Sequence, residues 1–289
     1  MRLEIRDVSK SYGREQALNH VSLDLTEGIY GLLGPNGAGK STLMNILVQN
    51  LEASSGEVLF NGKNIRALGK EYRKRIGYLP QTQIYYPDFT GLEFLYYMAS
   101  LKGMDEKKAE TVIREYLIEL GLWDDRNKKL KHYSGGMRQR LLLIQAVMDD
   151  PEILILDEPT AGMDPWQRIA VRNLIGKIGL DKIVIISTHV VQDVEQIAGR
   201  ILFLSKGKIL RDGTPEELEA GFEGKIRFFL VKKENISKLE PFGIITGIVR
   251  KNGLAEVRII LQRPFPYRGT PSAATIEDLY LWDFGKEPL

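Results

Sequence analysis

The chain has 289 residues, of which 43% are hydrophobic and 27% charged, so it is long enough for roughly two domains and too apolar to be disordered. Its net charge of +2 does not indicate nucleic acid or an anionic membrane as a partner, and without cysteine it has neither disulfides nor thiolate metal ligands. Its apolar runs are far shorter than the ~18 residues that cross a bilayer, and we expect a reducing, cytoplasmic location.

Strand patterns and a glycine-rich turn open the chain. Residues 3–8 and 21–25 are strand-like, and residues 28–33 form an apolar run that enters the turn. Helical spacing follows over residues 41–51. A strand, a glycine-rich turn and a helix in this order are typical of a phosphate-binding unit.

A helical insert is predicted over about residues 87–150. Thr90 and Glu93 form a capping-box pattern at its first helix, and Gly103 is placed to end that helix. Two apolar stripes recur along the helix, where one would be enough to pack on a core. The extra stripe indicates either a docking surface or a helix that is buried on all sides. The stripes are Leu92, Leu95, Tyr96 and Ala99, and Phe94, Tyr97, Met98 and Leu101.

Two fully apolar runs, residues 153–156 and 183–186, flank a helix that begins at Asp164 and Pro165. Such strands, interleaved with helices, predict an α/β fold with a mostly parallel sheet covered on both faces. Beyond Gly221 the pattern becomes rich in strands. We therefore expect two domains, residues 1–218 and a small α+β domain over residues 219–289.

The glycine-rich turn matches the phosphate-loop pattern GxxxxGK[ST]. Its glycines let backbone N–H groups point at phosphate oxygens, and the following helix presents the positive end of its dipole. Lys40 would reach the β- and γ-phosphates of a nucleotide, and Ser41 would hold Mg²⁺. The loop consists of Gly34, Pro35, Asn36, Gly37, Ala38, Gly39, Lys40, Ser41 and Thr42.

Polar side chains end both apolar runs. Asp157 and Glu158 follow the first run, at the sheet edge where ligands bind in such folds. Asp157 would serve Mg²⁺, and Glu158 would face an attacking water as base or orienting group. The alternative is a solvated strand end. His189 follows the second run and would contact the γ-phosphate; otherwise it is a capping or packing residue.

With the motif Tyr133-Ser134-Gly135-Gly136-Met137, the chain resembles the nucleotide-binding subunits of ABC transporters. The motif is similar to the signature LSGGQ, which in that family binds the γ-phosphate of ATP held by the other subunit. Ser134, Gly135 and Gly136 match the signature, whereas Tyr133 and Met137 depart from it. The resemblance implies that ATP is bound between two subunits, with anion binding by the Ser hydroxyl, backbone N–H groups and helix dipole.

The resemblance extends over residues 1 to about 218 and implies a P-loop NTPase fold with an antiparallel β edge and an inserted helical subdomain. Gln81 resembles the Q-loop glutamine that senses Mg²⁺ and water, so the expected metal ligands are Ser41, Gln81 and Asp157. Residues 161–164 resemble the D-loop. Tyr12 resembles the aromatic residue that stacks on adenine, although a tyrosine beside a turn is often only packing.

Residues 275–281 resemble the closing motif of ATP-binding subunits of ABC-2-type exporters. The resemblance implies a homodimer or pseudo-symmetric dimer of ATPase subunits on separately encoded transmembrane permease subunits, peripheral on the inner face of the cell membrane. Tyr85, Tyr86 and the helix after Thr90 would receive a cytoplasmic helix of the permease.

Two other functions are weighed against the transporter. A soluble ABC-type ATPase acting on nucleic acid or a ribosome would use a basic neighbourhood that lacks interleaved aromatic residues, so no nucleic acid partner is expected. Phosphotransfer to a small molecule is disfavoured because the signature motif would then have no purpose. The basic residues are Arg126, Lys128, Lys129, Lys131, Arg138 and Arg140.

Overall fold

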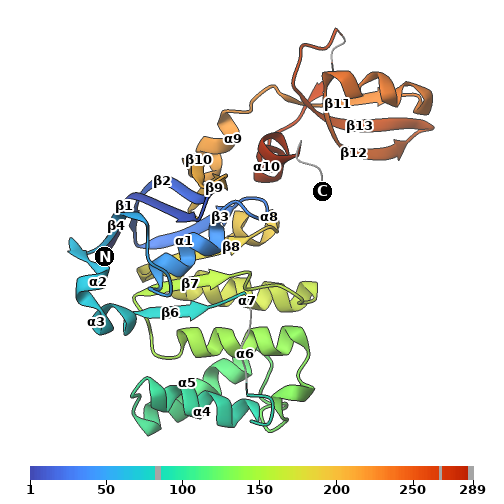
Figure 1. Cartoon of the computed structure of the whole chain (residues 1–289). Coiled ribbons are helices and arrows are strands. Elements are labelled where there is room, and N and C mark those ends of the chain that lie inside the picture. Colours follow the sequence, from blue (N-terminus) through green and yellow to red (C-terminus); the bar gives the residue numbers. More distant parts are fainter. Residues whose placement is uncertain (82–85, 267–268, 286–289) are drawn as a thin grey trace. The chain divides into compact units, whose positions relative to one another are not determined.

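The computed structural model describes residues 1–81, 86–266 and 269–285, and the chain forms two compact units, Met1–Leu210 and Arg211–Leu289. The division lies slightly before the boundary between residues 218 and 219 that the sequence pattern suggests. In the described part of the chain, no helix combines the length and apolar character needed to cross a bilayer. Each unit is described on its own below, with its elements labelled in Figure 1.

The main sheet of the first unit has the strand order β10-β9-β3-β8-β7-β6. The pairs β6–β7, β7–β8, β8–β3 and β3–β9 are all parallel. β7 and β8 are buried along their whole length, as the unbroken apolar runs predict. The strands are β3 (Gly28–Leu33), β6 (Ile76–Leu79), β7 (Ile153–Asp157), β8 (Ile183–Thr188), β9 (Arg200–Ser205) and β10 (Lys208–Gly213).

The antiparallel strands form a separate four-stranded sheet of order β2-β1-β4-β5. Its apolar side chains share one core with the main sheet and with helix α1 (Lys40–Leu47), whose Leu43, Met44 and Leu47 are fully buried. The phosphate loop therefore enters a helix that is held firmly in the core. The strands are β1 (Arg2–Tyr12), β2 (Glu15–Thr26), β4 (Ser55–Phe60) and β5 (Lys63–Asn64).

Helix α1 ends at Leu47, four residues before the end of the helical spacing. Gln49 has a φ of +62°, a left-handed conformation that cannot continue a helix. The N–H groups of Asn50 and Leu51 both bond back to the carbonyl of Asn45, closing the turn. The sequence-based extension to residue 51 was wrong because side-chain periodicity does not report this backbone reversal.

Three helices form the expected insert: α4 (Gly91–Leu101), α5 (Glu106–Glu119) and α6 (Gly135–Val147). Figure 1 shows them below β6 and β7. The capping box of Thr90 and Glu93 is present at α4, and Gly103 follows the helix with a φ of +71°. The remaining helices of this unit are α2 (Ile65–Leu68), α3 (Lys70–Arg73), η1 (Leu130–His132), α7 (Pro165–Ile178), η2 (Gly179–Asp181) and α8 (Val191–Glu195).

The second unit is a small α+β structure around an antiparallel sheet of order β12-β13-β11-β14. Phe229, Val257 and Ile259 lie in its core. Capping boxes begin α9 at Thr214 and α10 at Thr275. The elements are α9 (Pro215–Ala220), β11 (Ile226–Val231), η3 (Lys233–Lys238), η4 (Glu240–Phe242), β12 (Gly243–Lys251), β13 (Leu254–Leu261), β14 (Thr270–Pro271) and α10 (Ile276–Phe284).

Candidate functional site

The register of the main sheet brings the polar strand ends together. Asp157 at the end of β7 pairs with Ser187 of β8, and Leu33 at the end of β3 pairs with Thr188 of β8. The glycine-rich loop that follows β3 therefore begins beside the two carboxylates where β7 ends. This is the carboxyl edge of a parallel sheet, where α/β proteins bind their ligands.

Glycine is required by close backbone approach at two positions of the loop. A Cβ on Gly34 would lie 2.2 Å from the carbonyl oxygen of Leu204. Gly39 has a φ of +108°, and a Cβ there would lie 2.5 Å from the carbonyl oxygen of Ala17. The loop is thus held tightly against β2 and β9 and leads directly into the N-terminus of α1, where N–H groups and the helix dipole favour an anion.

Lys40 is buried at the first position of α1. Its Nζ donates hydrogen bonds to the carbonyl oxygens of Gly34 at 2.6 Å and Pro35 at 3.0 Å. Burial lowers the pKa of this ammonium group below its usual 10.5, and the nearby charges of Glu158 and Asp157 oppose that shift. The site therefore holds a desolvated cation close to two carboxylates.

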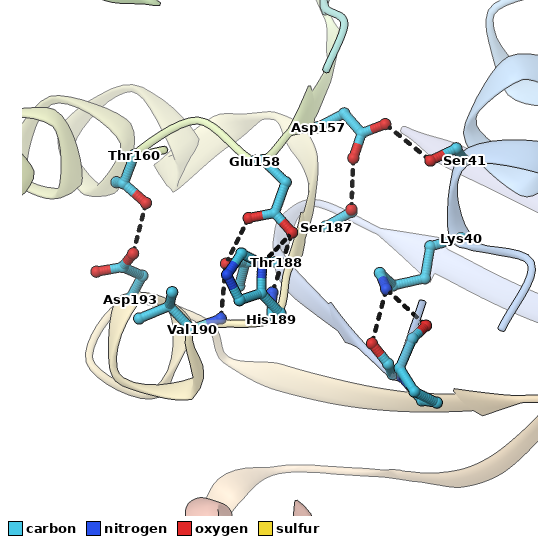
Figure 2. Close-up of polar contacts among 12 residues, drawn as sticks. Lys40, Ser41, Asp157, Glu158, Thr160, Ser187, Thr188, His189, Val190 and Asp193 are labelled. Atoms are coloured by element: carbon cyan, nitrogen blue, oxygen red, sulfur yellow. Dashed lines mark hydrogen bonds and ion pairs between the residues drawn. The ribbon is translucent and has the colours of Figure 1, made fainter. Parts of the chain in front are cut away.

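The two carboxylates have separate sets of hydrogen-bond partners, as Figure 2 shows. Asp157 accepts from Ser41 Oγ at 3.1 Å and from Ser187 Oγ at 2.6 Å, so it faces the phosphate loop. Glu158 accepts from Thr188 Oγ1 at 3.2 Å and from the backbone N–H of His189 at 3.1 Å. Both carboxylates are buried, which excludes the alternative of a solvated strand end.

His189 lies directly on Glu158. Its Nδ1 is 2.7 Å from Glu158 Oε1, while 63% of its side chain remains exposed to solvent. The ring is therefore neither buried in the core nor a helix cap. The Glu158 carboxylate and the histidine are in direct contact, although they are separated by 31 residues in the chain.

A cavity of about 440 Å³ lies over the loop and the carboxylates. Gln81 and Tyr12 line it together with most of the phosphate loop, and Tyr12 is half exposed with Lys10 Nζ 5.4 Å from the centre of its ring. The volume is in the range of small-molecule sites. The lining residues are Tyr12, Glu15, Ala17, Asn36, Gly37, Ala38, Gly39, Lys40, Ser41, Thr42, Gln81, Asp157 and Glu158.

Ser134, Gly135 and Gly136 do not line this cavity. Ser134 is the N-cap of α6, where its Oγ accepts from the N–H of Met137 at 3.1 Å, and Ser134 and Gly135 are exposed. Gly136 lies against the segment after Glu158, where a Cβ would be 3.2 Å from the carbonyl oxygen of Gly162. The phosphate loop and the Ser134 motif are thus two separate elements, of which the first lines the cavity and the second is turned to solvent.

Sequence reasoning missed several residues that shape the site. Glu15 and Ala17 line the cavity, Ser187 and Thr188 bond to the carboxylates, and Gln139 donates to the backbone of Glu158. Ser187 and Thr188 gave a usable signal, since this polar pair ends the buried strand β8 next to His189. Gln139 gave no signal, because its partner is 19 residues away and on another element.

A family model described as "ABC transporter" matches residues 18–161 of the chain. The Bacillus subtilis (strain 168) protein named uncharacterized ABC transporter ATP-binding protein YxlF is 36% identical over 251 residues, which are 86% of this chain and 83% of that protein. Nod factor export ATP-binding protein I of Rhizobium etli is 34% identical over 223 residues, covering 75% of this chain and 69% of that protein.

Solved structures of ATP-binding cassettes share the fold. One described as the ATP-binding subunit of an ABC transporter has a TM-score of 0.71 and 27% identity, and the match covers 77% of this chain and 93% of that one. A dimeric cassette, MJ0796, in a post-hydrolysis state with ADP and Pi, has a TM-score of 0.68 and 27% identity, and the match covers 73% of this chain and 98% of that one.

Proposed function

This chain belongs to the ABC transporter ATP-binding proteins, and we propose that it powers an ABC-2-type exporter through ATP-driven, head-to-tail dimerisation. It is an ATPase that binds ATP and serves a transporter. The observation that carries the proposal is the division of the site: Lys40, Asp157 and Glu158 border the cavity, whereas Ser134 and Gly135 face solvent. A second subunit is needed to bring the two halves together.

In this proposal the phosphate loop holds the ATP phosphates, with N–H groups of the loop and Lys40 on the phosphate oxygens, and Tyr12 stacks on adenine. Mg²⁺ would be held by Ser41, Asp157 and Gln81. Ser41 Oγ lies 3.1 Å from Asp157 Oδ2, and both side chains offer the oxygen ligands that Mg²⁺ prefers. No group of three or more His, Cys, Asp or Glu side chains could bind a metal in the described residues, so the phosphates would complete the coordination. When bound, the ion neutralises phosphate charge.

The lowered pKa of Lys40 predicts a pH dependence of ATP binding. Because burial favours the neutral amine, Lys40 loses its proton at a lower pH than an exposed lysine does, and the affinity for ATP should begin to fall below pH 10.5. In the same interval the ATP-free protein should become more stable as pH rises, since the unfolded chain holds this proton more tightly. Equilibrium binding of ATP in EDTA across the alkaline range measures the effect.

Lys40→Arg is the control, because its guanidinium keeps its charge throughout this range. The affinity of Lys40→Arg for ATP should not change with pH over this range. Identical profiles for the two proteins would show that another group titrates.

Glu158 is the proposed general base, held against His189 and Thr188 so that its carboxylate faces the cavity. A carboxylate that accepts hydrogen bonds on both oxygens keeps a fixed orientation toward an attacking water. His189 would bond to the γ-phosphate from the exposed part of its ring. Binding of ATP drives the closure of two subunits, and hydrolysis allows them to reopen.

The membrane partner would dock at a second cavity, of about 550 Å³, beside α4. Phe94, Met98 and Leu101 of α4 line it together with Tyr86 and Gln81, and Gln81 also lines the nucleotide cavity. Tyr85, which was also expected here, lies outside the described residues.

Only part of the second stripe is covered by the protein. Phe94 is buried, whereas Tyr97 and Leu101 are 38% and 63% exposed. Tyr97 packs edge-on against Tyr86 and Phe89 at ring distances of 5.5 and 5.8 Å. This exposed apolar surface fits a cytoplasmic helix of separately encoded transmembrane subunits, and would place the chain peripherally on the inner face of the cell membrane.

Charge at this surface should uncouple transport from hydrolysis. We expect Tyr97→Asp to keep the basal ATPase rate of the isolated protein and to lose its stimulation by the membrane subunits, because a carboxylate would be buried in the docked state. Ile118→Asp, at a 55% exposed position on α5, is the matched control. ATPase activity and transport measured in vesicles with the permease test this; stimulation at the wild-type level in Tyr97→Asp contradicts it.

The export direction is supported by a relative and by the C-terminal pattern. The protein named Nod factor export ATP-binding protein I aligns over 75% of this chain. Residues 275–281 carry the motif that resembles ABC-2-type subunits and form the first part of α10, capped by Thr275. Reconstitution with the membrane subunits in vesicles of defined orientation tests the direction.

The alternative, action on nucleic acid or a ribosome, loses support from the basic neighbourhood. Lys131 and Lys128 are paired with Asp88 at 2.9 Å and Asp125 at 2.5 Å. Arg140 is buried, with Nη1 donating to the carbonyl oxygen of Leu120 at 2.6 Å, and Arg138 donates to the carbonyl oxygen of Tyr133 at 2.7 Å. These partners neutralise part of the charge that a phosphate backbone would meet, although Lys128 and Lys131 remain exposed. RNA or ribosomes should therefore leave the ATPase rate unchanged.

A further inference from the structure

Gln139 of α6 reaches the backbone of the catalytic segment. Its Nε2 donates a hydrogen bond to the carbonyl oxygen of Glu158 at 2.8 Å, and only 3% of Gln139 is exposed. The bond connects the helix that begins at the Ser134 motif to the residue proposed as general base. Neither the match to the phosphate loop nor the match to the signature motif assigns a role to this side chain.

The backbone of Glu158 needs such support. Its φ is +53°, a left-handed conformation that is costly for a residue with a side chain and persists only where the surroundings hold it. Its N–H donates to the carbonyl oxygen of Ser187 at 2.9 Å, and its carbonyl accepts from Gln139 Nε2 at 2.8 Å and from the N–H of Ala161 at 3.2 Å. The bond from Ala161 comes from the same turn, so the Gln139 amide supplies the shorter of these two bonds and the one that comes from α6.

The first turn of α6 also packs on the chain just beyond Glu158. A Cβ on Gly136 would lie 3.2 Å from the carbonyl oxygen of Gly162 and 3.5 Å from the side chain of Met163. A displacement of α6 therefore cannot leave the segment after β7 unchanged, since packed elements transmit strain. Gln139 is the point where that helix is bonded to the catalytic residue itself.

We propose that Gln139 is a positioning residue for Glu158, through which the position of α6 sets the orientation of the catalytic carboxylate. This rests on the proposed function, in which the tip of α6 binds the phosphates held by a second subunit. When the α6 tip of one subunit closes on the nucleotide held by its partner, the same movement of α6 would align Glu158 of the first subunit. That Glu158 acts on the nucleotide held by the first subunit's own phosphate loop. The two ATP sites of the dimer are coupled by this contact.

The test compares Gln139→Met with Gln139→Glu in the full-length protein. Both keep the approximate shape of the side chain and remove its N–H donor; the Glu variant also places an acceptor against the carbonyl of Glu158. We expect kcat to fall by roughly ten- to a hundred-fold with the Kd for ATP changed by less than about two-fold, because positioning acts on the reacting geometry and not on binding. Cooperativity of hydrolysis in ATP should fall with kcat. Gln196→Met, at an exposed position after α8, is the control.

A second background separates positioning from a general structural effect. In Glu158→Gln, adding Gln139→Met should cause no further loss, because the group that it orients is already absent. Further loss there, with ATP affinity retained, would overturn the inference. The inference would also be overturned if both Gln139 variants kept the wild-type kcat and cooperativity. If Glu158→Gln is inactive in the same assay, the proposed function remains intact. Full activity of Glu158→Gln would instead remove the proposed function. If Met at position 139 prevents folding, the Glu variant alone decides.

Discussion

Glu158→Gln should lower the rate of ATP hydrolysis by about 10²–10⁴-fold, the contribution that a positioned general base makes. The amide keeps the size of the side chain and one oxygen that can accept from Thr188 or His189, but it is not a base. Binding should be retained, because Lys40 and the phosphate loop are unchanged. ATP would then hold two subunits together without being consumed.

Single-turnover hydrolysis, ATP binding and size-exclusion chromatography with light scattering measure these three properties. The dimer should accumulate in Glu158→Gln with ATP and disperse when ATP is removed. Glu71→Gln is a control for the same chemical change, since Glu71 is an exposed carboxylate paired with Lys74 on the surface. Near-normal turnover in Glu158→Gln would remove Glu158 from its role.

The second large effect is expected at the helix tip. Gly135→Asp should reduce hydrolysis by about 10²-fold or more, since its carboxylate would repel the phosphates that the N-terminus of α6 is proposed to bind. The fold should tolerate the change: a Cβ on Gly135 meets no atom within 4 Å, and an acidic residue at a helix N-terminus is favourable by about 0.3–1 kcal/mol. ATP should still bind to the intact phosphate loop of the variant.

A mixing experiment shows whether two chains share one site. Lys40→Ala destroys the phosphate loop but leaves the helix tip intact, and Gly135→Asp does the reverse. In a mixed dimer, one site combines the intact loop of one chain with the intact tip of the other. Random pairing gives half of the dimers one complete site each, so sites that act independently would restore about a quarter of the wild-type rate, and the coupling proposed through Gln139 would lower that value. If the mixture shows neither activity nor an ATP-dependent dimer, although both variants fold and Gly135→Asp binds ATP, the shared site is contradicted.

Local patterns in the sequence determined much of this protein. The glycine-rich loop, the carboxylates where β7 ends and the capping residues Thr90 and Asp164 all appear where their patterns predict. Each depends on residues within a few positions of one another, whose chemistry is fixed by short-range hydrogen bonds and backbone conformation. The unbroken apolar runs likewise identified β7 and β8 as buried strands before their neighbours were known.

Only the tertiary structure decided how these pieces act together. The register of β7 against β8 sets Asp157 beside Ser187, and the fold brings His189 and Gln139 onto Glu158 from segments that no local pattern connects. It also made the antiparallel strands a separate sheet and left Tyr97 exposed while Phe94 was buried. These outcomes depend on packing between residues far apart in the chain, where many partners satisfy the same hydrophobic pattern and shape alone selects among them.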